Sequence, residues 1–136
     1  MKIISYLTFN GNCREAMTFY HECLGGELDL MTIGESPMAN RMPQEMKGCI
    51  LHASLQKDNL TLTGSDMVGE QGLNRGNAVS LMLDCESEEE IRNRCDTLAA
   101  GGNPTHPLEN TFWGALFGGL TDKYGTPWLL HFNQKA

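Results

Sequence analysis

The sequence contains one strand–helix–strand pattern twice. An apolar run at residues 3–9 is followed by Asn12 and, three residues later, by Glu15, which together form a helix-capping pattern. The same order recurs at Ser87 and Glu90, an offset of 75 residues (12 to 87), and a Gly-Gly pair ends each predicted helix. A repeat that preserves strand, cap, helix and stop predicts two copies of one structural unit.

The apolar periodicity of the two copies predicts an α+β fold. Apolar residues at helical spacing behind Asn12 and behind Ser87 predict one amphipathic helix in each copy. Short apolar runs predict four strands around each helix, at 3–9, 28–33, 49–55 and 60–63 in the first copy and at 78–83, 103–108, 113–121 and 128–132 in the second. We expect two βαβββ modules, at about 1–66 and 77–136, joined by a polar, glycine-rich linker at about 67–76.

The composition excludes several classes of partner. Seventeen Asp and Glu against ten Lys and Arg give a formal charge of -7, so we expect no nucleic-acid partner. No apolar run approaches the roughly 20 residues that span a bilayer, and the amino terminus has no signal-peptide pattern, so we expect no membrane partner. Five cysteines without a C-x-x-C pair are typical of small buried side chains in a reducing compartment, which predicts a cytoplasmic protein.

The stretch at 109–132 concentrates the aromatic residues of the chain. It holds both tryptophans and three of the five phenylalanines. Two apolar runs lie on either side of a turn that begins at Asp122 and ends at Gly125, so the stretch predicts a hairpin. Because aromatic side chains bury large areas, this hairpin forms either part of a core or the wall of a pocket.

Four segments carry a resemblance to a known family: SYLTFNGNCREAMTFYHECLGGEL at 5–28, LHASLQ at 51–56, TGSD at 63–66 and FWGALFGGLTDKYGTPWLLHF at 112–132. In these segments the chain resembles the vicinal oxygen chelate superfamily, which includes glyoxalase I, bleomycin-resistance proteins and extradiol dioxygenases. The amino-acid sequence of these segments is most similar to the PhnB-like branch of the superfamily, labelled 3-demethylubiquinone-9 3-methyltransferase-like. The resemblance implies one glyoxalase-like domain at 1–136, in which both modules form a curved, mostly antiparallel, barrel-like sheet around a cavity, with the helices outside.

The resemblance also implies a place for a metal, and the residues depart from it. Enzymes of the superfamily hold a divalent metal through His, Gln or Glu side chains, and the metal acts as a Lewis acid. The matching positions in this sequence are Ser5, Ala78 or Ser80, and Leu129. None of these side chains is a usual ligand for zinc, nickel or iron. We therefore predict no cofactor and no metal at these positions, and a divalent metal at other residues remains an alternative.

Seven side chains are candidates for a site. Four of them are the expected apolar walls of the cavity: Phe112, Trp113, Phe117 and Trp128. His52 and Asp66 are the candidate acid–base pair, and His131 is a candidate polar contact to a ligand. The alternatives are that each histidine is a hydrogen-bonded core residue and that Asp66 caps a turn.

These residues predict a protein that binds a small organic molecule in an aromatic-lined cavity. Whether it catalyses a reaction is left open. One alternative is a metal-dependent lyase or oxygenase whose ligands are His52, Asp66 and His131. Another is a non-catalytic homodimer that sequesters an antibiotic or metabolite. We expect a homodimer in either case, because dimers are common among small soluble proteins and in the superfamily that the chain resembles. No strand-to-helix glycine loop is present for a nucleoside cofactor, so the residues do not favour methyl transfer.

Overall fold

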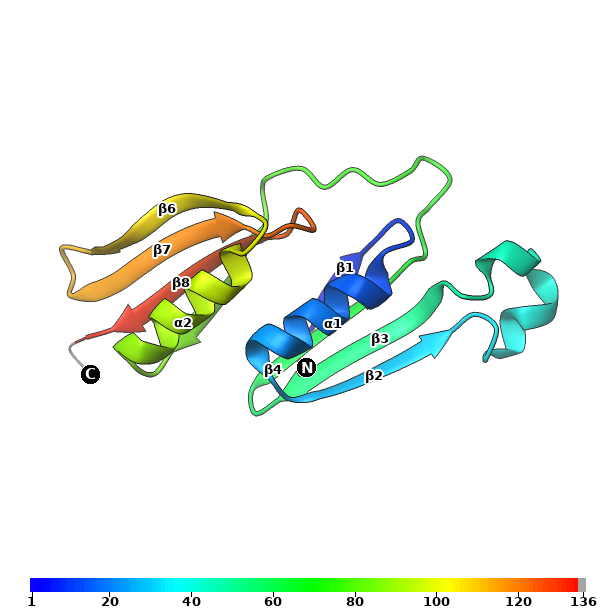
Figure 1. Cartoon of the computed structure of the whole chain (residues 1–136), viewed down its shortest axis with the longest axis horizontal. Helices are drawn as coiled ribbons and strands as arrows, with labels where there is room; N and C mark the ends of the chain where they lie inside the picture. Colours follow the sequence, from blue (N-terminus) through cyan, green and yellow to red (C-terminus); the bar gives the residue numbers. More distant parts are fainter. Residues whose placement is uncertain (135–136) are drawn as a thin grey trace. The chain divides into compact units, whose positions relative to one another are not determined.

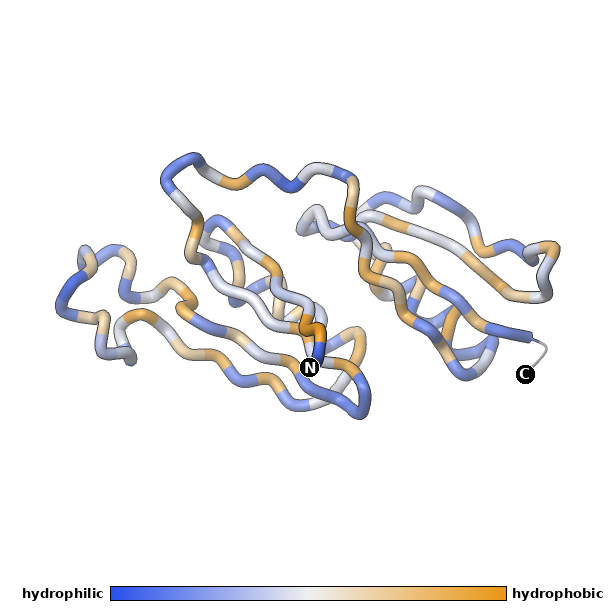
Figure 2. Tube along the Cα trace, turned by 180° about the vertical axis from the view of Figure 1, so that it is seen from behind, coloured by the Kyte–Doolittle hydropathy of each residue, from blue (hydrophilic) through white to orange (hydrophobic). Residues whose placement is uncertain are grey.

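The computed structural model describes residues 1–134, and the chain divides into two compact units, Met1–Asn74 and Arg75–Ala136. Figure 1 labels most of the elements of each unit. The segment between the last strand of the first unit and the first strand of the second is largely hydrophilic (Figure 2), and residues 69–80 are all exposed. None of the helices formed by residues 1–134 has the length and apolar character needed to cross a membrane.

The first unit is a four-stranded mixed sheet with one α-helix. Its elements are β1 (Ser5–Thr8), α1 (Cys13–Leu24), β2 (Glu27–Thr32), β3 (Ile50–Lys57) and β4 (Leu60–Ser65), with two short 3-10 helices, η1 (Pro37–Arg41) and η2 (Gln44–Met46), between β2 and β3. The strand order is β1-β4-β3-β2; β1 runs parallel to β4, and the other neighbouring pairs are antiparallel.

The second unit repeats this arrangement. Its elements are β5 (Leu81–Cys85), α2 (Glu88–Ala99), β6 (Asn103–Asn110), β7 (Ala115–Thr121) and β8 (Pro127–Asn133), in the strand order β5-β8-β7-β6. Again the first strand pairs in parallel with the last strand, and the remaining pairs are antiparallel. The predicted α+β fold with two repeated βαβββ modules is confirmed.

Each helix covers one face of the sheet in its own unit. The apolar stripe predicted for the first helix is buried, and it includes Cys13, Met17 and Tyr20 at 0% exposure. In the second unit the corresponding helix residues are Ile91 and Leu98, also at 0%. Burying a large apolar side chain of this kind stabilises the fold by about 1.5–3 kcal/mol, so these stripes fix which face of each helix meets its sheet.

The two helices begin differently, although the sequence predicts the same cap for both. At α2 the Ser87 hydroxyl accepts a hydrogen bond from the Glu90 amide at 3.0 Å, and the Glu90 carboxylate accepts one from the Glu86 amide at 2.9 Å. At α1 the side chain of Asn12 makes no capping hydrogen bond. The predicted capping pattern is therefore confirmed at Ser87 and wrong at Asn12, where a carboxylate from the end of β4 takes its place.

The glycine pair after each helix lies against the central hairpin of its unit. A Cβ atom at Gly26 would lie 2.5 Å from the Gln56 carbonyl oxygen, and the φ angle of Gly26 is 91°. A Cβ atom at Gly102 would collide with the Thr121 carbonyl oxygen. Glycine is required at both positions because the end of the helix and the hairpin approach each other too closely for a side chain. The repeat in the sequence thus corresponds to a repeated contact.

Some predicted strand limits are wrong. The strand predicted at 78–83 runs from Leu81 to Cys85, so Ala78 and Ser80 precede it and Asp84 lies within it. The strand predicted at 113–121 begins at Ala115, because residues 111–114 form the turn after β6. The predicted turn after β7 is confirmed by a hydrogen bond from the Gly125 amide to the Asp122 carbonyl oxygen at 2.9 Å.

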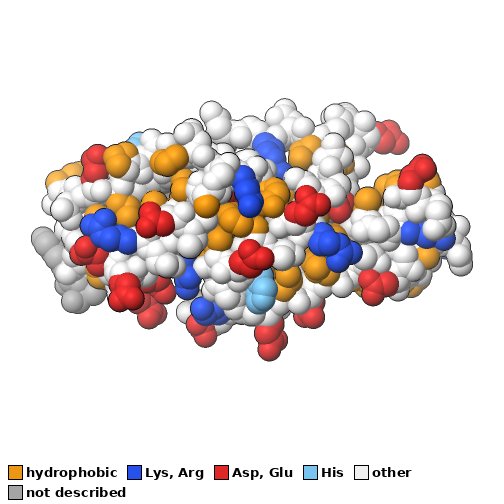
Figure 3. All heavy atoms as spheres, viewed as in Figure 1, with side chains coloured by type: hydrophobic (Ala, Val, Ile, Leu, Met, Phe, Trp, Pro, Cys, Tyr) orange, Lys and Arg blue, Asp and Glu red, His pale blue; other side chains and the backbone are white. Residues whose placement is uncertain are grey.

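Charged side chains are spread over the surface without a basic patch on the side shown in Figure 3. Acidic side chains on that side alternate with Lys and Arg. This distribution agrees with the formal charge of -7.

Candidate functional site

The second sheet has one face covered by α2 and one face without a helix. Along β8 the buried residues Trp128 and Leu130 alternate with Leu129 and His131, which are only partly buried. Because successive side chains of a strand point to opposite faces, Leu129 and His131 lie on the face opposite α2. We call this surface the helix-free face of the second unit.

A row of four side chains crosses the helix-free face, one from each strand. Asp84 of β5 is the Cα partner of His131 in β8. His131 is also the partner of Phe117 in β7, and Phe117 is the partner of Glu109 in β6. Residues that are directly opposite each other in neighbouring strands point to the same face of a sheet, so these four side chains form a continuous row. We refer to it as the Asp84–Glu109 row.

Within this row His131 and Asp84 are in direct contact. The Nδ1 atom of His131 lies 2.9 Å from an Asp84 carboxylate oxygen. The side chain of His131 is 23% exposed and that of Asp84 is 74% exposed, so the imidazole is partly enclosed while the carboxylate remains in water. No other hydrogen bond to the His131 ring is formed by residues 1–134. The second ring nitrogen, Nε2, is therefore free to bind another group.

Apolar residues lie beside the row. Met82 of β5 and Leu129 of β8 are Cα partners, two residues before Asp84 and His131 in their strands. Leu129 is also the partner of Gly119 in β7. A Cβ atom at Gly119 would lie 3.1 Å from a methyl carbon of Leu129, so the leucine side chain leans over the glycine. Met82 is 57% exposed. The helix-free face thus combines an apolar surface with one histidine–carboxylate pair.

Asp66, predicted as part of an acid–base pair, is bonded to the backbone. One of its carboxylate oxygens accepts hydrogen bonds from the amides of Gly11 at 3.0 Å and Cys13 at 2.9 Å. The other oxygen accepts from the Ile50 amide at 2.8 Å. The side chain is 8% exposed. Asp66 therefore ties the start of α1 to the start of β3, which corresponds to the alternative that the aspartate is structural.

His52 does not meet Asp66. It lies on β3, opposite Met31 of β2, and its side chain is exposed. No hydrogen bond or ion pair of His52 is formed within residues 1–134. The structure therefore places the two predicted catalytic residues on the same unit without a contact between them.

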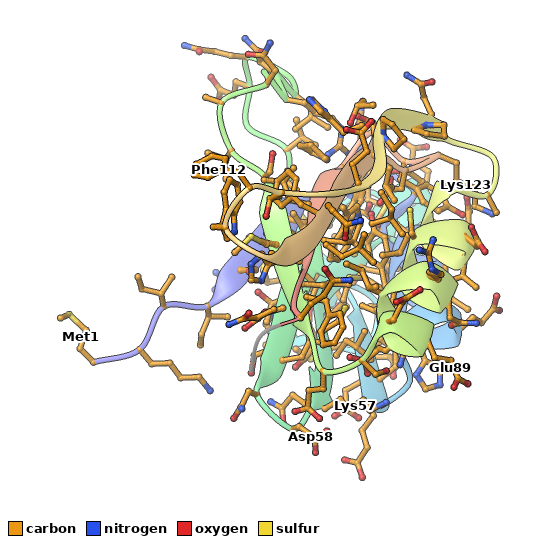
Figure 4. The ribbon with its side chains drawn as sticks, turned by 90° about the vertical axis from the view of Figure 1, so that its left-hand side faces the viewer. Met1, Lys57, Asp58, Glu89, Phe112 and Lys123 are labelled. Atoms are coloured by element: carbon orange, nitrogen blue, oxygen red, sulfur yellow. The ribbon has the colours of Figure 1, made fainter. Side chains whose placement is uncertain are left out.

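The predicted aromatic wall is divided among three environments. Trp128 is 2% exposed on the helix-covered face, and its indole N–H donates a 2.7 Å hydrogen bond to the Asp122 carboxylate. Phe117 is half-buried on the helix-free face, next to His131. Phe112 (labelled in Figure 4) and Trp113 lie in the turn between β6 and β7, at 96% and 52% exposure. Their rings meet edge to face with centroids 4.9 Å apart. Trp128 is therefore a core residue.

The positions that the resemblance assigns to metal ligands do not fit a divalent metal. Leu129 has no donor atom. Ser5 is the Cα partner of the buried Leu62, and its carbonyl oxygen accepts a 2.7 Å hydrogen bond from the Thr63 hydroxyl. Residues 1–134 contain no group of three or more His, Cys, Asp or Glu side chains arranged to hold a metal ion. The donor chemistry at these positions thus disagrees with the metal site that the superfamily implies.

Known proteins share both the sequence and the fold of this chain. A protein-family model described as 3-demethylubiquinone-9 3-methyltransferase matches residues 1–131. The protein YjdN of Escherichia coli is 34% identical, over 96% of this chain and 95% of its own length. The crystal structure of protein PA1353 from Pseudomonas aeruginosa is 38% identical with a TM-score of 0.86, and covers 98% of each chain.

A structure of a PhnB protein from Bacillus cereus, described as a putative 3-demethylubiquinone-9 3-methyltransferase, is 29% identical with a TM-score of 0.75, covering 97% of this chain and 99% of its own. More distant glyoxalase-related structures share the fold alone. The two βαβββ modules therefore form a glyoxalase-like fold. The chain belongs to the PhnB-like family described as 3-demethylubiquinone-9 3-methyltransferase, as the sequence resemblance predicts.

Two residues of the Asp84–Glu109 row were not predicted as site residues. The predicted strand ended at residue 83, so Asp84 fell outside it, whereas β5 extends to Cys85. Glu109 lies at the end of β6, beyond the predicted limit at 108. The alternation of Leu83 and Cys85 with the polar residues Asp84 and Glu86 was the signal for the longer first strand.

Proposed function

We propose that this protein binds a small organic molecule on the helix-free face of the second unit. Phe117 and Leu129 contact the apolar part of the ligand, and His131 contacts its polar part. The observation that carries the proposal is the Asp84–Glu109 row, in which an aromatic ring lies next to a histidine whose Nε2 atom has no partner within residues 1–134.

The chemistry of these side chains supports binding of this kind. Ligand sites in proteins combine apolar and aromatic surface with a small number of polar groups that fix orientation. Phe117 supplies a flat apolar surface, and His131 supplies a nitrogen that can accept or donate a hydrogen bond. His131 is also held by Asp84 at 2.9 Å, so its ring has a defined direction. The two residues are adjacent in the sheet, and one small molecule can contact both.

Five of the predicted site residues have no role in this proposal. Phe112 and Trp113 lie in the turn between β6 and β7. Asp66 uses both carboxylate oxygens for backbone amides, and Trp128 uses its indole N–H for Asp122. His52 forms no hydrogen bond or ion pair with Asp66. The donor set of the alternative metal-dependent lyase, which includes Asp66, is not favoured because this carboxylate is already bonded. Elemental analysis of protein purified without chelator tests that alternative: a stoichiometric divalent metal would support it.

A ligand screen with matched variants tests the proposal. Metabolites are screened by thermal shift, and hits are measured by calorimetry on the wild-type chain. We expect Phe117→Ala to weaken a hit about tenfold, which corresponds to a loss of about 1.4 kcal/mol. Val79→Ala serves as the control, because Val79 is 77% exposed and precedes β5. Hits that bind both variants equally well would overturn the proposed face.

Turnover distinguishes an enzyme from a sequestering protein. If a hit is converted, His131 is the candidate proton acceptor, because its Nε2 atom is free of other residues in the described chain. If a hit is bound tightly and recovered unchanged, the sequestering alternative is favoured. Mass spectrometry of the ligand after prolonged incubation with the protein decides between these outcomes.

A further inference from the structure

We propose that Asp84 holds His131 in the tautomer that carries its proton on Nδ1, so that Nε2 faces the ligand as a hydrogen-bond acceptor. The ligand then carries a hydroxyl or amine donor, and it is neutral or cationic. The ligand class rests on the proposed function. The tautomer of His131 does not, because it follows from the contact with Asp84 alone.

The tautomer follows from the chemistry of the contact. An ionised carboxylate has no proton and only accepts hydrogen bonds. The 2.9 Å contact between Asp84 and the Nδ1 atom of His131 is therefore a hydrogen bond only when Nδ1 carries a proton. In the neutral imidazole the other nitrogen, Nε2, is then unprotonated. Asp84 thus acts as a positioning residue, which determines what His131 can recognise.

The sheet holds this pair in place. Asp84 and His131 are Cα partners in the parallel pair β5–β8, so the backbone already brings their side chains together. On its other side His131 has Phe117 as its partner in β7. The imidazole is therefore flanked by a carboxylate and an aromatic ring, and it is 23% exposed. A ligand group that reaches Nε2 also lies close to Phe117.

The charges of the second sheet determine which ligands suit this face. The four strands β5, β6, β7 and β8 contain two carboxylates, Asp84 and Glu109, and no Lys or Arg. Both carboxylates belong to the Asp84–Glu109 row, one at each end. A bound anion would be repelled by both of them and would find no cation on these strands. A cationic ligand is attracted by both carboxylates and by the face of Phe117.

The tautomer is tested first, by nitrogen-15 correlation spectra of histidine-labelled full-length protein. The resonances of His131 are assigned by their loss in His131→Gln. We expect the neutral imidazole of the wild type to carry its proton on Nδ1 and none on Nε2. Asp84→Ala removes the acceptor, so the Nε2–H tautomer gains population. Asp84→Asn retains the preference for Nδ1–H, because its amide oxygen can still accept. A wild-type Nε2–H tautomer, or an Asp84→Ala spectrum unchanged from wild type, would overturn the inference.

The ligand class is tested with three probes of matched size: benzylamine, benzyl alcohol and benzoate. Each is titrated into uniformly nitrogen-15-labelled protein while the backbone amide resonances of Phe117, Leu129 and His131 are followed. We expect benzylamine and benzyl alcohol to shift these resonances and benzoate to bind most weakly. Glu109→Gln should weaken the binding of benzylamine about threefold, which is the effect expected from the loss of one exposed ion pair. The binding of benzyl alcohol should be unchanged.

The two proposals fail in different ways. Benzoate binding as tightly as benzylamine, at the same residues, would overturn the ligand class while supporting the proposed face. Shifts confined to other residues would overturn the proposed face, and the ligand class with it. The tautomer would stand in either case if the nitrogen-15 spectra agree with it.

Discussion

Two buried aspartates carry much of the local order of this protein at the scale of single residues. Asp66 accepts three backbone hydrogen bonds in the first unit. In the second unit Asp122 accepts hydrogen bonds from the backbone amides of Tyr124 and Thr126 and from the indole N–H of Trp128. A buried carboxylate is tolerated when its oxygens are satisfied in this way, and removing it leaves the donors unpaired.

Substitution of Asp66 is predicted to destabilise the protein. In Asp66→Asn one carboxylate oxygen is replaced by an NH2 group, which cannot accept from the amides it now faces. We expect a loss of about 3 kcal/mol in the free energy of unfolding, measured by urea denaturation. Asp58→Asn is the matched control, because Asp58 is exposed in a turn with φ of 50°, a conformation that asparagine also adopts. Equal stability of the two variants would contradict the role of Asp66.

The raised pKa values of buried thiols make the stability of the protein depend on pH above pH 9. Burial, with a further contribution from Asp66, raises the pKa of Cys13 from 9.0 to about 12. Burial, with Glu90 as the next cause, raises the pKa of Cys85 from 9.0 to about 11. Below pH 9 both thiols are protonated in the folded and unfolded states, so they add no pH dependence. Above it the unfolded chain loses these protons first, and stability falls until the folded thiols also ionise, near pH 11 for Cys85 and pH 12 for Cys13.

The measurement is urea unfolding on both sides of pH 9, with Cys13→Ala as the comparison. We expect the variant to lose less stability above pH 9 than the wild type does, since the contribution of the Cys13 thiol is gone. Identical slopes for the two proteins would contradict the contribution of Cys13.

At the scale of the elements, the two helices have the same sequence signature and different caps. Ser87 bonds the Glu90 amide at the start of α2, whereas the side chain of Asn12 makes no such bond at the start of α1. Ser87→Ala should therefore cost about 1 kcal/mol. Asn12→Ala should cost less, because Asp66 already satisfies the Cys13 amide. Both costs are measured by urea denaturation, and the prediction is wrong if they are equal.

The predictability of each element depends on how local its signal is. Both helices and their glycine stops were predicted, because caps, apolar stripes and glycine pairs are read from adjacent residues. The limits of β5 and β7 were wrong, since those strands begin where they find a partner and not where the apolar run begins. Asp84 was missed as a candidate site residue because β5 extends to Cys85, two residues beyond the predicted end of the strand.

At the scale of the whole molecule, the expected homodimer stays a prediction. Most soluble oligomers are symmetric, with dimers the commonest, and the resemblance implies a dimer for this chain. Sedimentation equilibrium should give a mass of twice the 15.0 kDa of one chain. The control is a dilution series, because a true dimer dissociates at low concentration according to mass action. A mass of one chain at every concentration would contradict the prediction.

The sequence by itself determined the repeat, the α+β fold, the family and most of the elements. Each of these depends on patterns along the chain that are independent of where distant residues meet. The tertiary structure alone decided what Asp66, Trp128 and His131 contact. Asp66 became a structural link because β4 ends beside α1, and Trp128 became a core residue because its position in β8 faces α2. His131 gained Asp84 because β5 and β8 pair in parallel in one particular register, and a shift of one residue would turn the two side chains to opposite faces.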